Sequence, residues 1–419
     1  MTDSQSIKSA KSIASAAAPT EPVSVYRKFA TRTLQRTDAF SLEPPGWWQS
    51  LDAGVRPTAA RDASSVSFIY SKSITGFIRA VTHRAIAELW AARSRVQWRT
   101  LCDLPTSEEQ GDAAREVLRL ILDGALEIET DNGYVSGPAA WRTLFGDCVI
   151  ERCSGTIADL SIAALRFATD LDIRNINAIA ASLYGFNFAP ATPAWRRRLP
   201  SPAAVDRFLD TDTIGRNPSL SRTWKRQPAQ PGFICWTAAS APSRKTAKGK
   251  RYKLYISPGI ECMPECFRRA VEIIPHHNAH SFKVGADLCG LLRADKMIVY
   301  LNSFSCLSAL AKDLESELRS LRVCGVPFTA SLESSGLLSW GIDPDPRGDG
   351  SDAMSWRIWI CRKLAAALLT ACEADNSDME PWEFATRRIL LENVDSATWR
   401  PSKRFASRNA PTGARSCST

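Results

Sequence analysis

The 419-residue chain lacks any run of 18 or more apolar residues, which a membrane-spanning helix would need. It also lacks a C-x-x-C pair, and its first 22 residues contain no Leu or Val that could form the core of a secretory signal. These absences argue against a membrane span and a cleaved signal. The 12 cysteines are scattered, which favours buried free thiols in a reducing cytoplasm.

Two motifs of phosphoryl transfer are also missing. The chain has no Gly-rich phosphate loop and no H-R-D motif, so we do not expect it to phosphorylate its own substrate. What it does have is an ordinary globular composition, 44% hydrophobic and 23% charged, with the length of two or three domains. Its formal net charge of +9 favours an anionic partner.

Shifts in composition predict the organisation of the chain. Residues 1–22 are rich in Ser and Ala, and residues 400–419 are basic without an acidic residue, so both are expected to be disordered. Residues 195–231 are rich in Arg, Pro and Ser, which is typical of a linker. We therefore predict a helical domain over 23–194 and an α+β domain over 232–399.

The N-terminal half is predicted to be helical with one small hairpin. A capped helix starts at Ser107, and apolar residues follow it at spacings of three and four: Ala114, Val117, Leu118, Ile121 and Leu122. Asn132-Gly133 then separates two short strands, as in a primed turn. Helices followed by such a hairpin resemble a winged helix. The hairpin is acidic, which argues against nucleic acid as a partner.

The C-terminal half alternates strands and helices. Strands are expected at 233–237, 252–257, 279–285, 296–301 and 337–342, and helices at 264–274, 304–321 and 356–371. From residue 252 the order is β-α-β-β-α-β, the split βαβ pattern. We expect a mostly antiparallel sheet with helices on one face.

Cysteine and histidine cluster near the first of these helices. Cys262 and Cys266, and His276 and His280, each have a spacing that zinc ligands use, and His277 lies between the histidines. Only nine residues separate the two pairs, which is short for a zinc finger. Two buried thiols near a polar turn are the favoured interpretation, and no metal is expected.

The densest basic run of the chain extends from Arg244 to Arg251. Such runs are most often solvated hairpin tips. The alternative is an electrostatic arm that holds an acidic peptide or nucleic acid.

The predicted strands carry cations and phenols. Period 2 places Lys253 and Tyr255 on one face of their strand, Lys283 opposite its apolar neighbours, and Arg293 just ahead of the strand with Tyr300. These groups could converge on an anion, and desolvation would lower the pKa of a lysine towards use as a base. The alternative is a set of ordinary residues on a half-buried sheet.

Short motifs in 233–371 resemble the HopA family of type III effectors and the related lyases of lanthipeptide and thioamitide biosynthesis. They are Arg251-Tyr-Lys-Leu-Tyr255, Phe282-Lys283-Val284, Arg293-x-Asp295-x-x-x-x-Tyr300, Pro327-Phe328-Thr329, the segment 336–344 (GLLSWGIDP) and Ser355-Trp356-Arg357. These families look similar to phosphothreonine lyases, which eliminate phosphate from phosphoserine or phosphothreonine and leave a dehydroamino acid.

The resemblance implies roles for individual residues. The phosphothreonine lyases have Lys-x-His, a base Lys, an Arg and a Tyr in that order. By that order Lys283 would be the base, Lys253, Arg293 and Arg357 would bind phosphate, and Asp295 and Tyr300 would support them. Tyr255 stands where the acid histidine would be, so the general acid is either Tyr255 or His280, although strand parity puts His280 and Lys283 on opposite faces.

The resemblance therefore implies a carbon–oxygen lyase without a metal or organic cofactor, acting on a phosphorylated peptide or protein. The alternative is a non-catalytic adaptor that binds a phosphopeptide or leader peptide for a partner kinase. The winged-helix-like half would bind a leader peptide in a biosynthetic enzyme. The Ser-rich N-terminus resembles an effector's export segment, so the protein is either cytoplasmic or secreted into a host cell.

Overall fold

The structure is a computed structural model. It describes residues 22–50, 67–92, 94–102, 107–146, 155–228, 231–239, 252–344, 354–374, 378–402 and 405. The predicted leader (1–22) and tail (400–419) lie almost wholly outside these residues, as does the basic run that ends at Arg251. The chain divides into two compact units, Met1–Arg152 with Leu369–Leu391, and Cys153–Leu368 with Glu392–Thr419.

The first unit contains the predicted helix and hairpin. Helix α4 (Ser107–Leu122) precedes strands β6 (Leu126–Thr130) and β7 (Gly133–Val135). The hairpin extends into a four-stranded sheet of order β5-β1-β6-β7, through β1 (Thr33–Arg36) and β5 (Val96–Gln97). Of this four-stranded sheet, the sequence predicted only the β6-β7 hairpin.

The described residues of the first unit also form a second sheet and further α-helices. The sheet has the order β2-β3-β4, with β2 (Phe40–Ser41), β3 (Ser67–Ser71) and β4 (Ile78–Val81). The helices are α1 (Pro22–Phe29), α2 (Arg84–Ala92), α3 (Trp98–Leu101), α5 (Gly137–Phe145) and α16 (Pro381–Arg388).

Residues 195–231 are largely helical and belong to the second unit, so the prediction of an irregular linker there is wrong. Helices α8 (Pro193–Arg198), α9 (Pro202–Leu209) and α11 (Pro218–Thr223) each have a proline in the first turn. Their N-cap side chains, those of Thr192, Ser201 and Asn217, each accept a hydrogen bond from a first-turn N–H. Proline at the start of a capped helix fixes a favourable φ, so these prolines begin helices.

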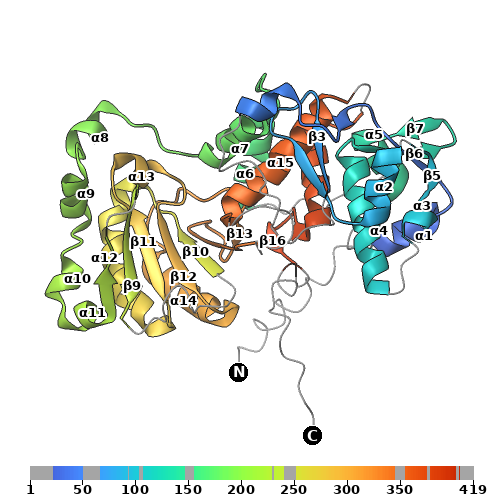
Figure 1. Cartoon of the computed structure of the whole chain (residues 1–419). Coiled ribbons are helices and arrows are strands. Elements are labelled where there is room, and N and C mark those ends of the chain that lie inside the picture. The colour runs from blue at the N-terminus through green and yellow to red at the C-terminus, as the bar shows by residue number, and fades with distance from the viewer. Residues whose placement is uncertain are drawn as a thin grey trace, which may run out of the picture. The chain divides into compact units, whose positions relative to one another are not determined.

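The second unit is built on a seven-stranded antiparallel sheet of order β13-β14-β10-β12-β11-β9-β8 (Figure 1). Its strands are β8 (Trp224–Arg226), β9 (Phe233–Ala238), β10 (Tyr252–Ile256), β11 (Ser281–Gly285), β12 (Met297–Leu301), β13 (Ala330–Ser331) and β14 (Leu338–Ile342). The main helices after β9 are α12 (Met263–Ile273), α14 (Phe304–Leu318) and α15 (Trp356–Cys372). Strands β14, β10, β12 and β11 give the order expected of a split βαβ unit, which confirms the predicted topology.

The sheet has one apolar face, which helices cover. Trp236 of β9 and Phe282 of β11 stack with ring centres 4.8 Å apart, and Phe267 of α12 packs against both. Phe304 of α14 contacts Trp340 of β14, with ring centres 4.8 Å apart. Helices α12 and α14 therefore lie on the same face, as the sequence predicted, and Figure 1 shows them behind the strands. The start of α15 lies against the other face, because a Cβ on Gly341, the register partner of Lys253, would meet the Trp356 ring. The prediction that all helices cover one face is therefore wrong for α15.

Strand β11 is joined to the short helix α13 (Leu288–Leu292) by a close approach of two glycines. A Cβ on Gly285 would lie 2.4 Å from the carbonyl carbon of Gly290, which is too close for any side chain. Asp287 caps the helix, because its side chain accepts a hydrogen bond of 2.7 Å from the Gly290 N–H. The chain then runs directly into Arg293. Other helices of the unit are α6 (Thr156–Thr169), α7 (Ile176–Gly185) and α10 (Thr213–Arg216), with the two-stranded pair β15 (Val394–Asp395) and β16 (Arg400–Pro401).

Candidate active site

The second face of the sheet carries the predicted cations and phenols. Lys253 pairs with Tyr300, while Tyr255 and Lys283 both pair with Ile298 from opposite sides. Residues directly opposite each other in an antiparallel sheet share a face. The structure therefore brings Lys253, Tyr255, Lys283 and Tyr300 together on the face opposite α12 and α14, and we call it the polar face.

Lys253 is held by a carboxylate. Its side chain is buried, and Nζ lies 2.6 Å from Oδ1 of Asp343 and 5.6 Å from the centre of the Tyr300 ring. Asp343 also accepts a hydrogen bond of 2.9 Å from the backbone N–H of Trp356, at the start of α15. Lys253 is thus fixed in position, and its charge is partly neutralised.

Lys283 has no ion-pair partner within the described part of the chain. Its Nζ lies 3.7 Å from the centre of the Phe233 ring. Burial lowers the pKa of Lys283, and the positive charge of nearby Lys253 lowers it further. A half-buried lysine without a carboxylate, beside other cations, is suited to bind an anion or to accept a proton.

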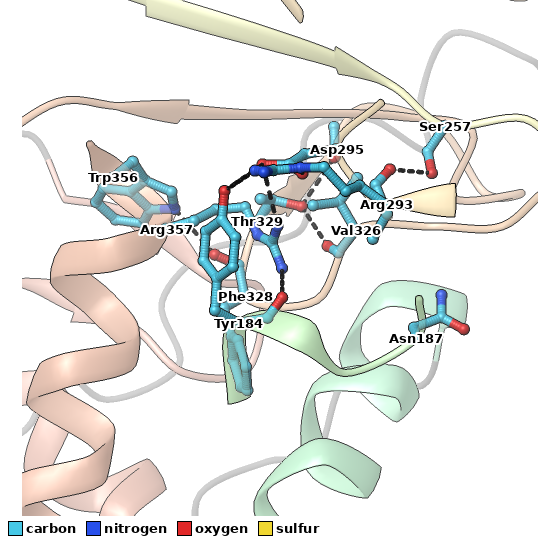
Figure 2. Close-up of polar contacts among 12 residues, drawn as sticks. Tyr184, Asn187, Ser257, Arg293, Asp295, Val326, Phe328, Thr329, Trp356 and Arg357 are labelled. Carbon is cyan, nitrogen blue, oxygen red and sulfur yellow. Dashed lines mark hydrogen bonds and ion pairs between the residues drawn. The ribbon is translucent and has the colours of Figure 1, made fainter. Parts of the chain in front are cut away.

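A buried ion network is formed by Tyr184, Arg293, Asp295 and Arg357 (Figure 2). It lies near Lys283, because the Lys283 and Arg293 side chains both contact the Phe233 ring. Asp295 accepts hydrogen bonds from Arg293 Nε at 2.9 Å and from the Tyr184 hydroxyl at 2.8 Å, and Arg357 Nη1 lies 3.1 Å from its Oδ2. Arg293 Nη2 donates to the Tyr184 hydroxyl as well, and Arg357 Nη2 donates to the Tyr184 carbonyl at 2.8 Å. Two guanidinium groups therefore share the Asp295 carboxylate, and each also donates a hydrogen bond to Tyr184, Arg293 to its hydroxyl and Arg357 to its carbonyl.

The network leaves one edge of Arg293 available. Its Nε and Nη2 engage Asp295 and Tyr184, whereas Nη1 makes no hydrogen bond to any described residue. Its side chain is 25% exposed, and that of Arg357 only 1%. Arg293 can thus donate to an external anion. The predicted role of Arg357 as a phosphate ligand stays a prediction, and its burial favours the indirect role of holding Asp295.

Charge balance sets the pKa values in the network. Burial acts to raise the pKa of Asp295, but the charge of Arg357 and the hydrogen bond from Arg293 hold it well below its usual range. Burial and the negative charge of Asp295 raise the pKa of Tyr184 to about 12. Asp295 is therefore ionised and Tyr184 is a neutral donor at neutral pH.

The two candidate acids, Tyr255 and His280, have different neighbours. Tyr255 is 1% exposed and packs against Ala294, Ile298 and Val326, and burial, with the charge of Asp343, raises its pKa well above the usual value. Its phenol stays protonated, as a proton donor must. The His280 ring centre lies 6.0 Å from that of Tyr300.

The combined charge of the cluster is positive. Lys253, Lys283, Arg293 and Arg357 supply four cationic groups against the two carboxylates Asp295 and Asp343. An excess of positive charge beside the half-buried Lys283 favours an anion such as a phosphate ester. Tyr184 and Asp343 were missed from the sequence: Tyr184 lies on α7, 111 residues before Asp295, and no local pattern marks it.

The cysteines and histidines near α12 have other surroundings than a metal site. Cys266 is buried in the core, and His277 Nε2 lies 2.8 Å from Asp313 Oδ2. Within the described residues, no three His, Cys, Asp or Glu side chains are arranged to hold a metal ion. In the same part of the chain, no helix combines the length and apolar character needed to cross a bilayer.

Comparison with known proteins gives similarity in structure only. No family model matches the chain. No curated protein matches it in sequence. A solved effector protein from Pseudomonas syringae pv. tomato strain DC3000 is similar at 13% identity and a TM-score of 0.40, covering 59% of this chain and 98% of the effector.

Two phosphothreonine lyases are also similar. OspF from Shigella flexneri has 14% identity and a TM-score of 0.24, covering 32% of this chain and 90% of its own. SpvC from Salmonella has 16% identity and a TM-score of 0.26, covering 43% of this chain and 90% of its own. Similarity at this level does not assign the chain to a family. The relation to HopA-type effectors and phosphothreonine lyases remains a resemblance, and the link to lanthipeptide and thioamitide biosynthesis stays a prediction.

Proposed function

We propose that the second unit binds a phosphorylated Ser or Thr of a peptide or protein and eliminates its phosphate, leaving a dehydroamino acid. The observation that carries this proposal is the environment of Lys283. Lys283 is a half-buried lysine with a lowered pKa, without an ion-pair partner among the described residues, beside the cations Lys253 and Arg293. Elimination needs a base beside a phosphate-binding group, and this cluster contains both.

The step moves one proton and one leaving group. Neutral Lys283 Nζ takes the proton on Cα of the phosphorylated residue, and the electron pair of that bond forms the Cα=Cβ double bond. The Cβ–O bond breaks, and its electrons leave on the phosphate. The free Nη1 edge of Arg293 and the ammonium group of Lys253 bind the phosphate oxygens as their negative charge grows.

Tyr255 is the acid that the geometry favours. It shares the polar face with Lys253 and Lys283, and its pKa is raised by burial, so it holds its proton at neutral pH. His280 immediately precedes β11 at a position of the opposite parity to Lys283. Tyr300 and Asp295 support the site by holding Lys253 and Arg293.

The test is mass spectrometry of phosphothreonine peptides incubated with the full chain. The proposal expects loss of phosphoric acid and a dehydrated product. Lys283→Ala and Lys283→Arg should both abolish turnover, because the arginine keeps the charge but does not lose its proton at neutral pH. Lys312→Ala, an exposed lysine on α14 of the opposite face, is the matched control and should turn over normally.

A non-catalytic adaptor is the second candidate. The burial of Tyr255 favours it, because a phenol that is 1% exposed reaches a leaving group only if its surroundings open. An adaptor would bind the phosphopeptide and release it unchanged. Lys283→Arg would then retain binding, since only the positive charge is needed. A leader-binding role for the first unit, and the choice between a biosynthetic enzyme and a secreted effector, stay predictions.

A further inference from the structure

Burial on the polar face falls steadily towards one edge of the sheet. Lys253 and Tyr255 on β10 and Ile298 on β12 are at most 5% exposed. Ser281 and Lys283 on β11 and Thr237 on β9 are half-buried, and Lys225 on the edge strand β8 is exposed. The phosphate-binding residues therefore lie at the closed end of a surface that opens towards β8.

Strand register places the residues of this surface in one row. Tyr300 pairs with Ser281, Ser281 with Thr237, and Thr237 with Lys225, so all four lie on the polar face. The hydroxyl groups of Ser281 and Thr237 make no hydrogen bond to any described residue. Two available hydroxyls thus lie between the site and an exposed cation.

The two basic residues of β8 differ in their partners. Arg226 lies on the other face, where Nη2 is 2.9 Å from Asp206 and the guanidinium is 5.8 Å from the centre of the Trp236 ring. Lys225 has no carboxylate partner in the described residues. The positive charge of Lys225 is therefore available to a ligand on the polar face, whereas that of Arg226 is neutralised.

We propose that the polar face of β11, β9 and β8 binds the substrate peptide beyond its phosphorylated residue, and that Lys225 selects an acidic side chain there. This inference rests on the proposed function for the position of the phosphate. An acidic peptide is the occupant because Lys225 is an exposed cation without a carboxylate partner in the described chain. The hydroxyls of Ser281 and Thr237 lie between Lys225 and Lys283, where they meet the peptide backbone.

The strand register also gives the distance between Lys283 and Lys225. Lys283 and Lys225 are separated by two strand spacings across the sheet and by two residues along it. With about 4.8 Å between strands and about 3.3 Å per residue, their Cα atoms lie roughly 12 Å apart. An extended peptide covers that distance in about three to four residues. The acidic residue should therefore stand three or four positions from the phosphorylated one.

The experiment uses the full chain and phosphothreonine peptides that differ only by Asp or Asn at the third and fourth positions on each side. Binding is measured by fluorescence anisotropy and turnover by mass spectrometry. Asp at one of these positions should lower KM and Kd about two- to fivefold, the effect of one exposed ion pair, without changing kcat. The preference should shrink in high salt.

Variants separate Lys225 from a general charge effect. Lys225→Ala should remove the preference, Lys225→Glu should reverse it in favour of a Lys-bearing peptide, and Lys312→Ala should leave it unchanged. Equal affinity for the Asp and Asn peptides, or a preference that survives in Lys225→Ala, would overturn the inference. If no peptide is turned over, the proposed lyase activity is wrong, but the binding measurements still test the role of Lys225. If none binds, both proposals fail.

Discussion

Asp295 is the carboxylate that Arg293 and Arg357 share, and replacing it by asparagine tests the candidate site most directly. It is 3% exposed, and it contacts Arg293, Arg357 and the Tyr184 hydroxyl. An asparagine keeps the shape but removes the charge, and its amide group adds donors where donors already converge. Removing one member of a buried ion pair costs about 3 to 5 kcal/mol, so Asp295→Asn should lower the free energy of unfolding by that amount.

The control is the same substitution at an exposed ion pair. Asp210 lies 2.6 Å from Arg216, and the two side chains are 60% and 64% exposed. Exposed pairs contribute roughly 0 to 1 kcal/mol, and asparagine tolerates the left-handed backbone of Asp210. Urea unfolding followed by tryptophan fluorescence compares the two variants with the parent chain.

The pH dependence of stability is a second test of the same variant. The folded pKa of Asp295 is lowered, so its stabilisation is complete above the unfolded pKa of about 3.9 and is lost as pH falls through the folded value. The difference in free energy of unfolding between the parent chain and Asp295→Asn should stay constant from pH 8 to about 5 and become smaller below about pH 4. Equal losses for Asp295→Asn and Asp210→Asn, or a difference that grows in acid, would refute the shared-carboxylate network.

Three further outcomes are expected. Because burial lowers the pKa of Lys283 and its neutral form is the proposed base, kcat/KM for phosphopeptide should rise with pH and level off below pH 10.5, the usual lysine value; a rate that falls across this range would contradict the assignment. The exposed thiol of Cys289 should react rapidly with a thiol reagent in the native protein, whereas burial raises the pKa of Cys266 to about 12 and should protect it until unfolding. Gly285→Ala should destabilise the second unit by roughly 1 to 3 kcal/mol or more in urea unfolding, because its Cβ would meet backbone that cannot rotate away.

The sequence predicted the part of the second unit from β9 onwards well, because most elements there are long enough to show their periods. Strand β10 alternates Lys253 and Tyr255 with apolar residues, and the stripe of α14 includes the buried Leu307 and Leu314. The candidate residues on β10, β11 and β12 could be assigned to a common face from parity alone. Period 2 fixes which face a side chain takes, and the antiparallel order then brings neighbouring strands together.

Other features depend on contacts that no local pattern records. Strand β5 has two residues, too few for alternation to be read, so the four-stranded sheet of the first unit was missed. Tyr184 lies on α7, far along the chain from Asp295, and a tyrosine on an amphipathic helix looks like any core residue. The burial of Arg357 was missed for the same reason, since its partners come from distant segments.

The contact between Gly285 and Gly290 constrains the positions of Lys283 and Arg293 in the candidate site. Gly285 ends the strand that carries Lys283, and Gly290 lies on the short helix that leads into Arg293. The spacing between these two cations is therefore set by main chain against main chain, and changes of side-chain size in the surrounding core would leave it nearly constant. Lys225 lies on the edge strand β8, away from this contact, so it can be exchanged without moving Lys283 or Arg293.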